Sequence, residues 1–206
     1  MSTRVAAAVE RALDERQREA TEEVERILAA AVRVMERVAP EPPRVSDIVA
    51  EAGSSNKAFY RYFAGKDDLI LAVMERGVGI VESYLRHQMA KETTPRDKVA
   101  RWIEGAVAQV ADPHLISMSR AAAGQLSAGG GRAADREIMR PLRDLLVVPI
   151  TELGSDGGAR DVERDVEAVF SCTTATMRRY LGSTERPLPA DIAHLVRFCL
   201  RGLGAA

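Results

Sequence analysis

The chain has 206 residues, of which 29% are charged and only 4% aromatic, and its formal net charge is −1. Such a chain can bury a sizeable core as one large domain or two small ones, and its few aromatic residues predict an aliphatic core. The charge excludes nucleic-acid binding through a uniformly basic surface, although a local patch would be enough. We see no signal peptide and no apolar run near the ~20 residues that span a membrane, so we expect a cytoplasmic protein without membrane contacts.

Almost every segment carries apolar residues at helical spacing, and none shows the sustained alternation of a strand. The predicted fold class is therefore all-α. Residues 1–20, rich in Ala, Arg and Glu, are expected to form an N-terminal extension, either as an additional helix or as a mobile arm. A helix is then predicted over Thr21–Val38, and the three prolines that follow within five residues end it.

The segment Val45–Phe63 predicts two short helices joined by a tight turn. Gly53 supplies the conformational freedom that the turn needs, and either Ser54 or Ser55 offers a side-chain oxygen that can cap the second helix. This arrangement is typical of a helix-turn-helix, whose second helix enters the major groove of DNA with its N-terminal residues first.

The second short helix has two chemically different sides. Phe59 and Phe63 are four residues apart and are expected to point into the core. Asn56, Lys57 and Tyr60 then fall on the outward side. Between residues 53 and 66 the charged residues are all basic: Lys57, Arg61 and Lys66. The segment therefore predicts a local cationic surface on a chain that is nearly neutral overall.

Over about the first third of the chain, from Thr21 to Met74, the sequence resembles the DNA-binding domain of TetR-family transcriptional regulators. The resemblance rests on Tyr60-Arg61-Tyr62-Phe63 and on Gly65-Lys66-Asp67-Asp68-Leu69. It implies a helix-turn-helix domain over residues 21–66 and a ligand-binding and dimerisation domain over residues 67–206. The family's usual Gly-Val-Ser turn is Gly-Ser-Ser here, and its Gly/Pro-Thr pair on the recognition helix is Lys-Ala. The operator sequence of relatives therefore does not carry over.

We expect both base and phosphate contacts from this domain. Asn56 and Lys57 are the expected base contacts, because an amide can pair with adenine and an ammonium group with guanine. Lys66 can bind phosphate together with the free N–H groups of the following helix. For Tyr62, phosphate contact and core packing both remain open. The full set of expected DNA-binding residues is Arg44, Ser46, Ser55, Asn56, Lys57, Tyr60, Tyr62 and Lys66.

The remaining two thirds of the chain are also predicted to be helical, with a long helix opened by Asp67 and Asp68, where acids suit the helix dipole. The stretch from Ala133 to Leu153 contains Pro141 and Pro149, so it should be kinked or split. The other helices are predicted over Pro95–Ala111, residues 113 to about 127, Asp161–Leu181 and Pro189–Leu203.

The resemblance implies an effector pocket in this part of the chain and dimerisation through its last two helices. The candidate pocket residues, for each of which core packing is the alternative, are Trp102, Met118, Gln125, Met139, Phe170, Thr173, Thr174 and Met177. The candidate dimer interface is Val166, Phe170, Ile192, Leu195, Val196, Cys199, Leu200 and Leu203. The polar run Cys172–Thr176 fits either a pocket wall or a seam of small residues between copies.

The sequence offers no catalytic or metal site. His87, His114 and His194 have no carboxylate or cysteine at ligand spacing, and the glycines at residues 129–131 lack the Lys-Ser/Thr of a phosphate-binding loop. The two cysteines lie far apart in apolar helical patterns and are expected to be buried free thiols. We therefore expect neither an enzyme nor a protein that needs a cofactor.

Together these features predict a homodimeric transcriptional regulator. The expected partners are double-stranded operator DNA, a second copy of the chain and a small-molecule effector. Its expected function is that of a repressor that a small, largely apolar ligand releases from a palindromic operator. The alternatives are a helix-turn-helix DNA-binding protein without an effector, and an activator.

Overall fold

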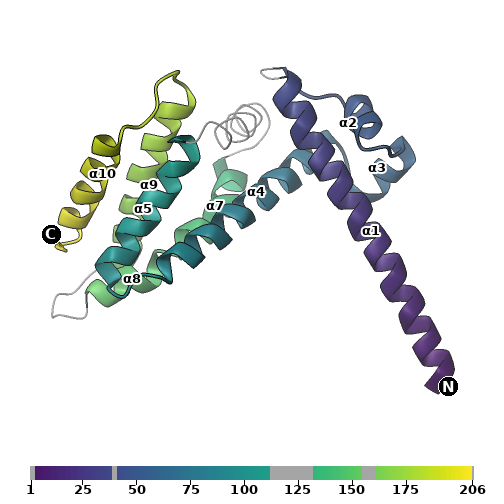
Figure 1. Cartoon of the computed structure of the whole chain (residues 1–206), viewed down its shortest axis with the longest axis horizontal. Coiled ribbons are helices and arrows are strands. Elements are labelled where there is room, and N and C mark those ends of the chain that lie inside the picture. Colours follow the sequence, from purple (N-terminus) through teal and green to yellow (C-terminus); the bar gives the residue numbers. More distant parts are fainter. Residues whose placement is uncertain (1–2, 39–40, 112–131, 155–160, 206) are drawn as a thin grey trace. The chain divides into compact units, whose positions relative to one another are not determined.

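The computed structural model describes residues 3–38, 41–111, 132–154 and 161–205, and the helix expected after Pro113 lies outside them. Within the described residues all regular secondary structure is helical, which confirms the all-α class (Figure 1). The helices are α1 (Thr3–Val38), α2 (Val45–Glu51), α3 (Asn56–Tyr62), α4 (Lys66–Met89), α5 (Pro95–Ala111), α7 (Arg132–Asp144), α8 (Val147–Leu153), α9 (Val162–Leu181) and α10 (Pro189–Gly202).

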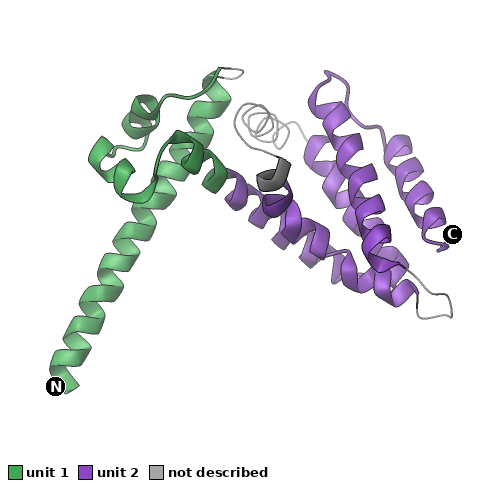
Figure 2. Ribbon diagram, turned by 180° about the vertical axis from the view of Figure 1, so that it is seen from behind, with its two compact units in different colours: residues 1–73 green, residues 74–206 purple. Residues whose placement is uncertain are grey.

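The chain divides into two compact units, residues 1–73 and 74–206 (Figure 2). The first holds α1, α2, α3 and the start of α4, which is the expected helix-turn-helix arrangement, and the second is larger and helical. The division falls inside α4, after the boundary expected between residues 66 and 67.

Helix α1 begins at Thr3, so residues 3–38 form one continuous helix rather than an extension followed by a helix that starts at Thr21. The sequence explains this, because residues 3–38 contain neither glycine nor proline and are rich in strong helix formers. The buried residues of α1 all lie in its second half, from Ile27 to Met35. Along the first half, Val5, Val9 and Leu13 are exposed.

The turn between α2 and α3 begins as a Schellman motif at the end of α2. The amide of Gly53 donates to the carbonyl of Ala50 at 3.2 Å, and the amide of Ser54 donates to the carbonyl of Val49 at 3.0 Å. Gly53 has a φ of +60°, the left-handed conformation that this motif requires. The turn therefore depends on glycine at this position.

The larger unit is organised around α5, which packs against α8, α9 and α10. Trp102 of α5 is fully buried in this core, and its ring lies 6.1 Å from that of Phe170, between centroids. Its indole Nε1–H donates to the carbonyl of Leu142 in α7 at 3.0 Å. A buried tryptophan thus satisfies its polar group by joining α5 to α7.

The proline-containing stretch is split, as predicted, between α7 and α8. At the junction the amide of Leu146 bonds the carbonyl of Arg143, three residues back, at 3.0 Å. Pro149 lies in the first turn of α8, where the missing N–H would have no partner inside the helix. The split leaves the carbonyl of Leu142 available to Trp102.

We expect Gly53→Ala to lower the free energy of unfolding by about 1–2 kcal/mol, because an added Cβ is strained at a φ of +60° even where space is open. Urea denaturation of the full chain, followed by circular dichroism, measures the change. Gly79→Ala is the control, since Gly79 lies within α4 with open space where a Cβ would stand, and should gain stability from alanine. If Gly53→Ala is as stable as the wild type or more stable, the turn does not require glycine at this position.

Candidate functional site

Helix α3 presents an exposed polar face because its opposite face is anchored. Ser55 is the N-cap, and its side-chain oxygen accepts a hydrogen bond from the amide of Ala58 at 3.1 Å. Ala58 and Phe59 are buried, with Phe59 fully inaccessible. The outward side chains are therefore those of Asn56 and Lys57, which are exposed, and of Tyr60, which is 61% exposed.

The other expected DNA contacts lie at the starts of helices α2 and α4. Arg44 is the exposed N-cap residue of α2, and Ser46 donates from its hydroxyl to Asp47 at 3.3 Å. Lys66 begins α4 and is half-buried. Two cations, Lys57 and Lys66, form no ion pair with any residue that the structure describes, so each can meet a phosphate or a base without first breaking a bond.

Tyr62 is bound inside the domain. It is half-buried, and its hydroxyl donates to the carboxylate of Glu23 in α1 at 2.9 Å. The guanidinium of Arg61 lies 3.8 Å from the same carboxylate and 5.5 Å from the centre of the Tyr62 ring. Of the two alternatives for Tyr62, this geometry favours packing. Glu23 was not among the residues expected from the sequence, since nothing local on α1 marks it.

A second carboxylate ties α2 to α1. Glu51 accepts from Nε of Arg33 at 2.8 Å and from Nη1 of Arg37 at 3.1 Å. The hydrogen bond from Arg33, then that from Arg37, lowers the pKa of the Glu51 carboxyl. Glu51 therefore holds α2 to α1 through ion pairs with Arg33 and Arg37, and these ion pairs persist at neutral pH.

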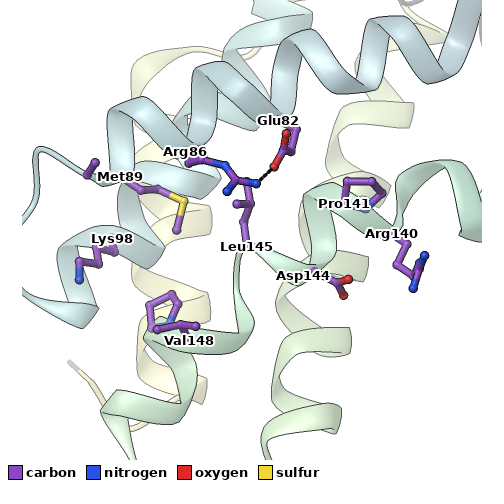
Figure 3. Close-up of a pocket in the computed structure, with 11 residues that line it drawn as sticks. Glu82, Arg86, Met89, Lys98, Arg140, Pro141, Asp144, Leu145 and Val148 are labelled. Atoms are coloured by element: carbon purple, nitrogen blue, oxygen red, sulfur yellow. Dashed lines mark hydrogen bonds and ion pairs between the residues drawn. The ribbon is translucent and has the colours of Figure 1, made fainter. Parts of the chain in front are cut away.

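The larger unit has an open groove of about 600 Å³ between the C-terminal half of α4, the start of α5 and the α7–α8 junction. Figure 3 shows Arg86 and Leu145 reaching toward the same space, with Arg86 paired to Glu82. The lining combines apolar side chains with charges and consists of Glu82, Arg86, Met89, Ala90, Lys98, Arg140, Pro141, Asp144, Leu145, Val148 and Pro149. Such a lining suits a mostly apolar molecule with a polar end.

The six candidate pocket residues that the structure describes do not line this groove. Trp102 and Thr173 are buried in the core, and the Thr173 hydroxyl donates to the carbonyl of Val169 at 2.8 Å. Met139, Phe170 and Met177 are half-buried against the same core, and Thr174 bonds the carbonyl of Phe170 at 2.9 Å. Met118 and Gln125 lie outside the described residues. Trp102, Met139, Phe170, Thr173 and Met177 pack in or against the core, and Thr174 bonds within its own helix.

The apolar stripe of α10 also belongs to the core of its own chain. Val196, Cys199 and Leu200 of α10, Leu203 just after it and Val166 of α9 are at most 9% exposed, because α10 packs against α5 and α9. In the single chain these side chains leave little surface for a partner, and the dimer seam stays a prediction. Of the eight candidates, those that keep some surface are Phe170, Ile192 and Leu195.

The outer side of α10 carries a different apolar residue, Phe198, which is 61% exposed.

The cysteines are free thiols, with Cys199 buried and Cys172 half-buried. Burial raises the pKa of the Cys199 thiol to about 11, so this group stays protonated at neutral pH.

Within the described part of the chain, His, Cys, Asp and Glu side chains form no group of three or more that could hold a metal ion. None of the helices there has the length and apolar character that crossing a membrane requires.

Residues 27–73 match the family model described as bacterial regulatory proteins, tetR family. Over these residues the chain is similar to regulatory proteins of the tetR family. The match includes all of α2 and α3, and so Asn56, Lys57 and Tyr60 lie within the matched residues. No curated protein sequence matches this chain.

Several solved structures share the fold of this chain. FadR from Bacillus subtilis, solved with stearoyl-CoA, is 20% identical with a TM-score of 0.68, and the match covers 87% of this chain and 96% of FadR. FadR from Bacillus halodurans is 20% identical with a TM-score of 0.70, covering 86% and 94%. RolR, solved with resorcinol, is 17% identical with a TM-score of 0.67, covering 91% and 90%. At these identities the similarity shows the fold.

Proposed function

We propose that this regulator is a dimeric repressor that binds a palindromic operator through α3 and leaves it when a small, largely apolar ligand binds the larger unit. The observation that carries the proposal is the two-sided α3, with Phe59 fully buried and Asn56, Lys57 and Tyr60 exposed. A short helix anchored in this way presents amide, ammonium and phenol groups toward a groove.

The exposed groups divide by chemistry into base and phosphate contacts. Asn56 and Lys57 stand in the first turn of α3, the part of a recognition helix that meets base edges. Tyr60 and Lys66 are assigned to phosphates, as are Arg44 and Ser46 at the start of α2. The side chain of Ser55 already caps α3, so a DNA contact from this residue would be additional.

Dimerisation follows from the size of the recognition helix. Seven residues reach only a few base pairs, and two-fold symmetry places two such helices in successive major grooves, ~34–36 Å apart. We assign the contact between copies to the outward sides of α9 and α10, where Phe198 is 61% exposed. An exposed phenylalanine on a helix that already has a buried stripe fits a surface covered by another chain.

The groove is the proposed effector site, and α4 is the proposed link to DNA. Helix α4 begins within the DNA-binding unit, and Glu82, Arg86 and Met89 in its far half line the groove. A ligand that binds better to one position of α4 would shift the population of DNA-binding conformations. The stearoyl-CoA bound to FadR and the resorcinol bound to RolR support effector binding by this fold. An effector-free DNA-binding protein and an activator remain the alternatives.

Selection of operator DNA from a random pool, followed by mutation, tests the DNA-binding assignment. Asn56→Ala and Lys57→Ala should relax specificity at one operator position each, by about 1–3 kcal/mol. Lys66→Ala and Tyr60→Phe should weaken binding to all sequences, and Lys66→Ala should flatten the salt dependence by about one unit. Wild-type affinity and specificity in all four variants would refute the assignment.

Phe198→Glu should convert the dimer to folded monomers, because it adds a charge to the proposed seam without disturbing a buried residue. Sedimentation velocity at several concentrations measures the change. Ile80→Glu is the matched control, since Ile80 on α4 is 59% exposed and should leave the dimer intact. A dimer of unchanged affinity in Phe198→Glu would place the interface elsewhere.

A compound that releases operator DNA should also change the fluorescence of Trp102 saturably, with the same dissociation constant. Trp102 is the only tryptophan, and it is bonded to the carbonyl of Leu142, next to Pro141 in the groove wall. Val148→Arg should weaken both the release of operator DNA and the change in Trp102 fluorescence, because Val148 is an exposed residue of the groove lining. Ile80→Arg should alter neither.

A flat tryptophan signal from a releasing compound would place the effector pocket elsewhere. If a broad library of apolar compounds contains no binder, the effector-free alternative is favoured.

A further inference from the structure

One carboxylate on α1 contacts residues that flank both ends of the recognition helix. Glu23 Oε1 accepts from the hydroxyl of Ser54, just before α3, at 3.2 Å, and Oε2 accepts from the hydroxyl of Tyr62, the last residue of α3, at 2.9 Å. Nη1 of Arg61 lies 3.8 Å from Oε2. Glu23 therefore bridges the start and the end of α3 and fixes both to α1.

The side chain of Glu23 is placed where such bonds are strong. It is 23% exposed, and hydrogen bonds to an ionised carboxylate exceed those between neutral groups. Its role differs from that of Glu51, which receives Arg33 and Arg37 and so holds α2. Ser54 supplies one of the Glu23 contacts.

The orientation of helix α3 depends on these hydrogen bonds to Glu23. The helix contains seven residues, of which only Ala58 and Phe59 are buried, so few apolar contacts resist its rotation. Base recognition tolerates displacements of only about 0.5 Å. Bonds at both ends prevent the rotation that would move Asn56 and Lys57 away from base edges.

The same carboxylate holds two groups that would otherwise suit DNA phosphates. The Tyr62 hydroxyl is committed to Glu23, and the charge of Arg61 is partly neutralised by it. A guanidinium or phenol released from Glu23 could bind phosphate on any sequence, which adds affinity without specificity.

We propose that Glu23 is a positioning residue for operator specificity: it orients α3 and keeps Arg61 and Tyr62 from contacting phosphates of unrelated DNA. This inference rests on the proposed function. Loss of Glu23 lowers affinity for the operator while affinity for unrelated DNA stays the same or rises. A residue that only stabilises the fold would change both affinities in the same direction.

The test uses the full chain, the operator selected by the wild-type protein, and scrambled DNA of equal length over a series of salt concentrations. We expect Glu23→Ala to bind the operator about tenfold more weakly, which corresponds to about 1.4 kcal/mol. Binding to scrambled DNA should be unchanged or tighter, with a salt dependence steeper by about one unit as Arg61 is released.

Two variants separate charge from position. Glu22→Ala removes the same charge from the adjacent exposed residue of α1 and should keep the wild-type ratio of operator to scrambled affinity. Glu23→Gln keeps an acceptor oxygen without the charge, so it should recover part of the operator affinity while its salt dependence stays steep. If circular dichroism shows that Glu23→Ala is unfolded, Tyr62→Phe tests the inference instead. Its ratio of operator affinity to scrambled-DNA affinity should be lower than that of the wild type.

A parallel loss of affinity for both DNAs in folded Glu23→Ala, or an unchanged ratio, overturns the inference and leaves the proposed function intact. An unchanged ratio in Tyr62→Phe overturns it when that variant decides. If the wild-type chain selects no sequence from the random pool, the proposed function fails and this inference fails with it.

Discussion

The recognition helix has seven residues, and a helix of that length is not stable in water without tertiary contacts. Its geometry therefore depends on what surrounds it. Ser55 caps its first turn, Phe59 buries its inner side, and Glu23 fixes both ends to α1. The exposed face of Asn56, Lys57 and Tyr60 is the consequence of these anchors. The chemistry that α3 presents is thus a property of α1 as much as of α3.

In the larger unit, one hydrogen bond of a buried tryptophan connects the core to the wall of the groove. The indole of Trp102 reaches the Leu142 carbonyl because the helix breaks before Leu146. The two prolines of this stretch lie inside the resulting helices, at Pro141 and Pro149, and both also line the groove. The same break that interrupts the helix therefore shapes the wall of the proposed effector site.

Much of the architecture was predictable because it follows from local patterns. Helical periodicity predicted the helices, Gly53 marked the turn, and the split around Pro141 and Pro149 followed from missing amide donors. The resemblance predicted a helix that begins at Thr21, with residues 1–20 either helical or mobile, and the structure shows one continuous helix from Thr3. No glycine or proline enforces a boundary at Thr21. Local propensity decided that boundary.

What the sequence by itself determined was the all-α class, the helix-turn-helix and the outward face of α3, because each depends on residues a few positions apart. Only the tertiary structure decided the rest. The stripe of Val196, Cys199 and Leu200 looks the same in sequence whether it faces α5 or a second copy, since apolar periodicity identifies a buried side without naming its partner. Glu23 meets Ser54 and Tyr62 across more than thirty residues, and only folding brings such groups together.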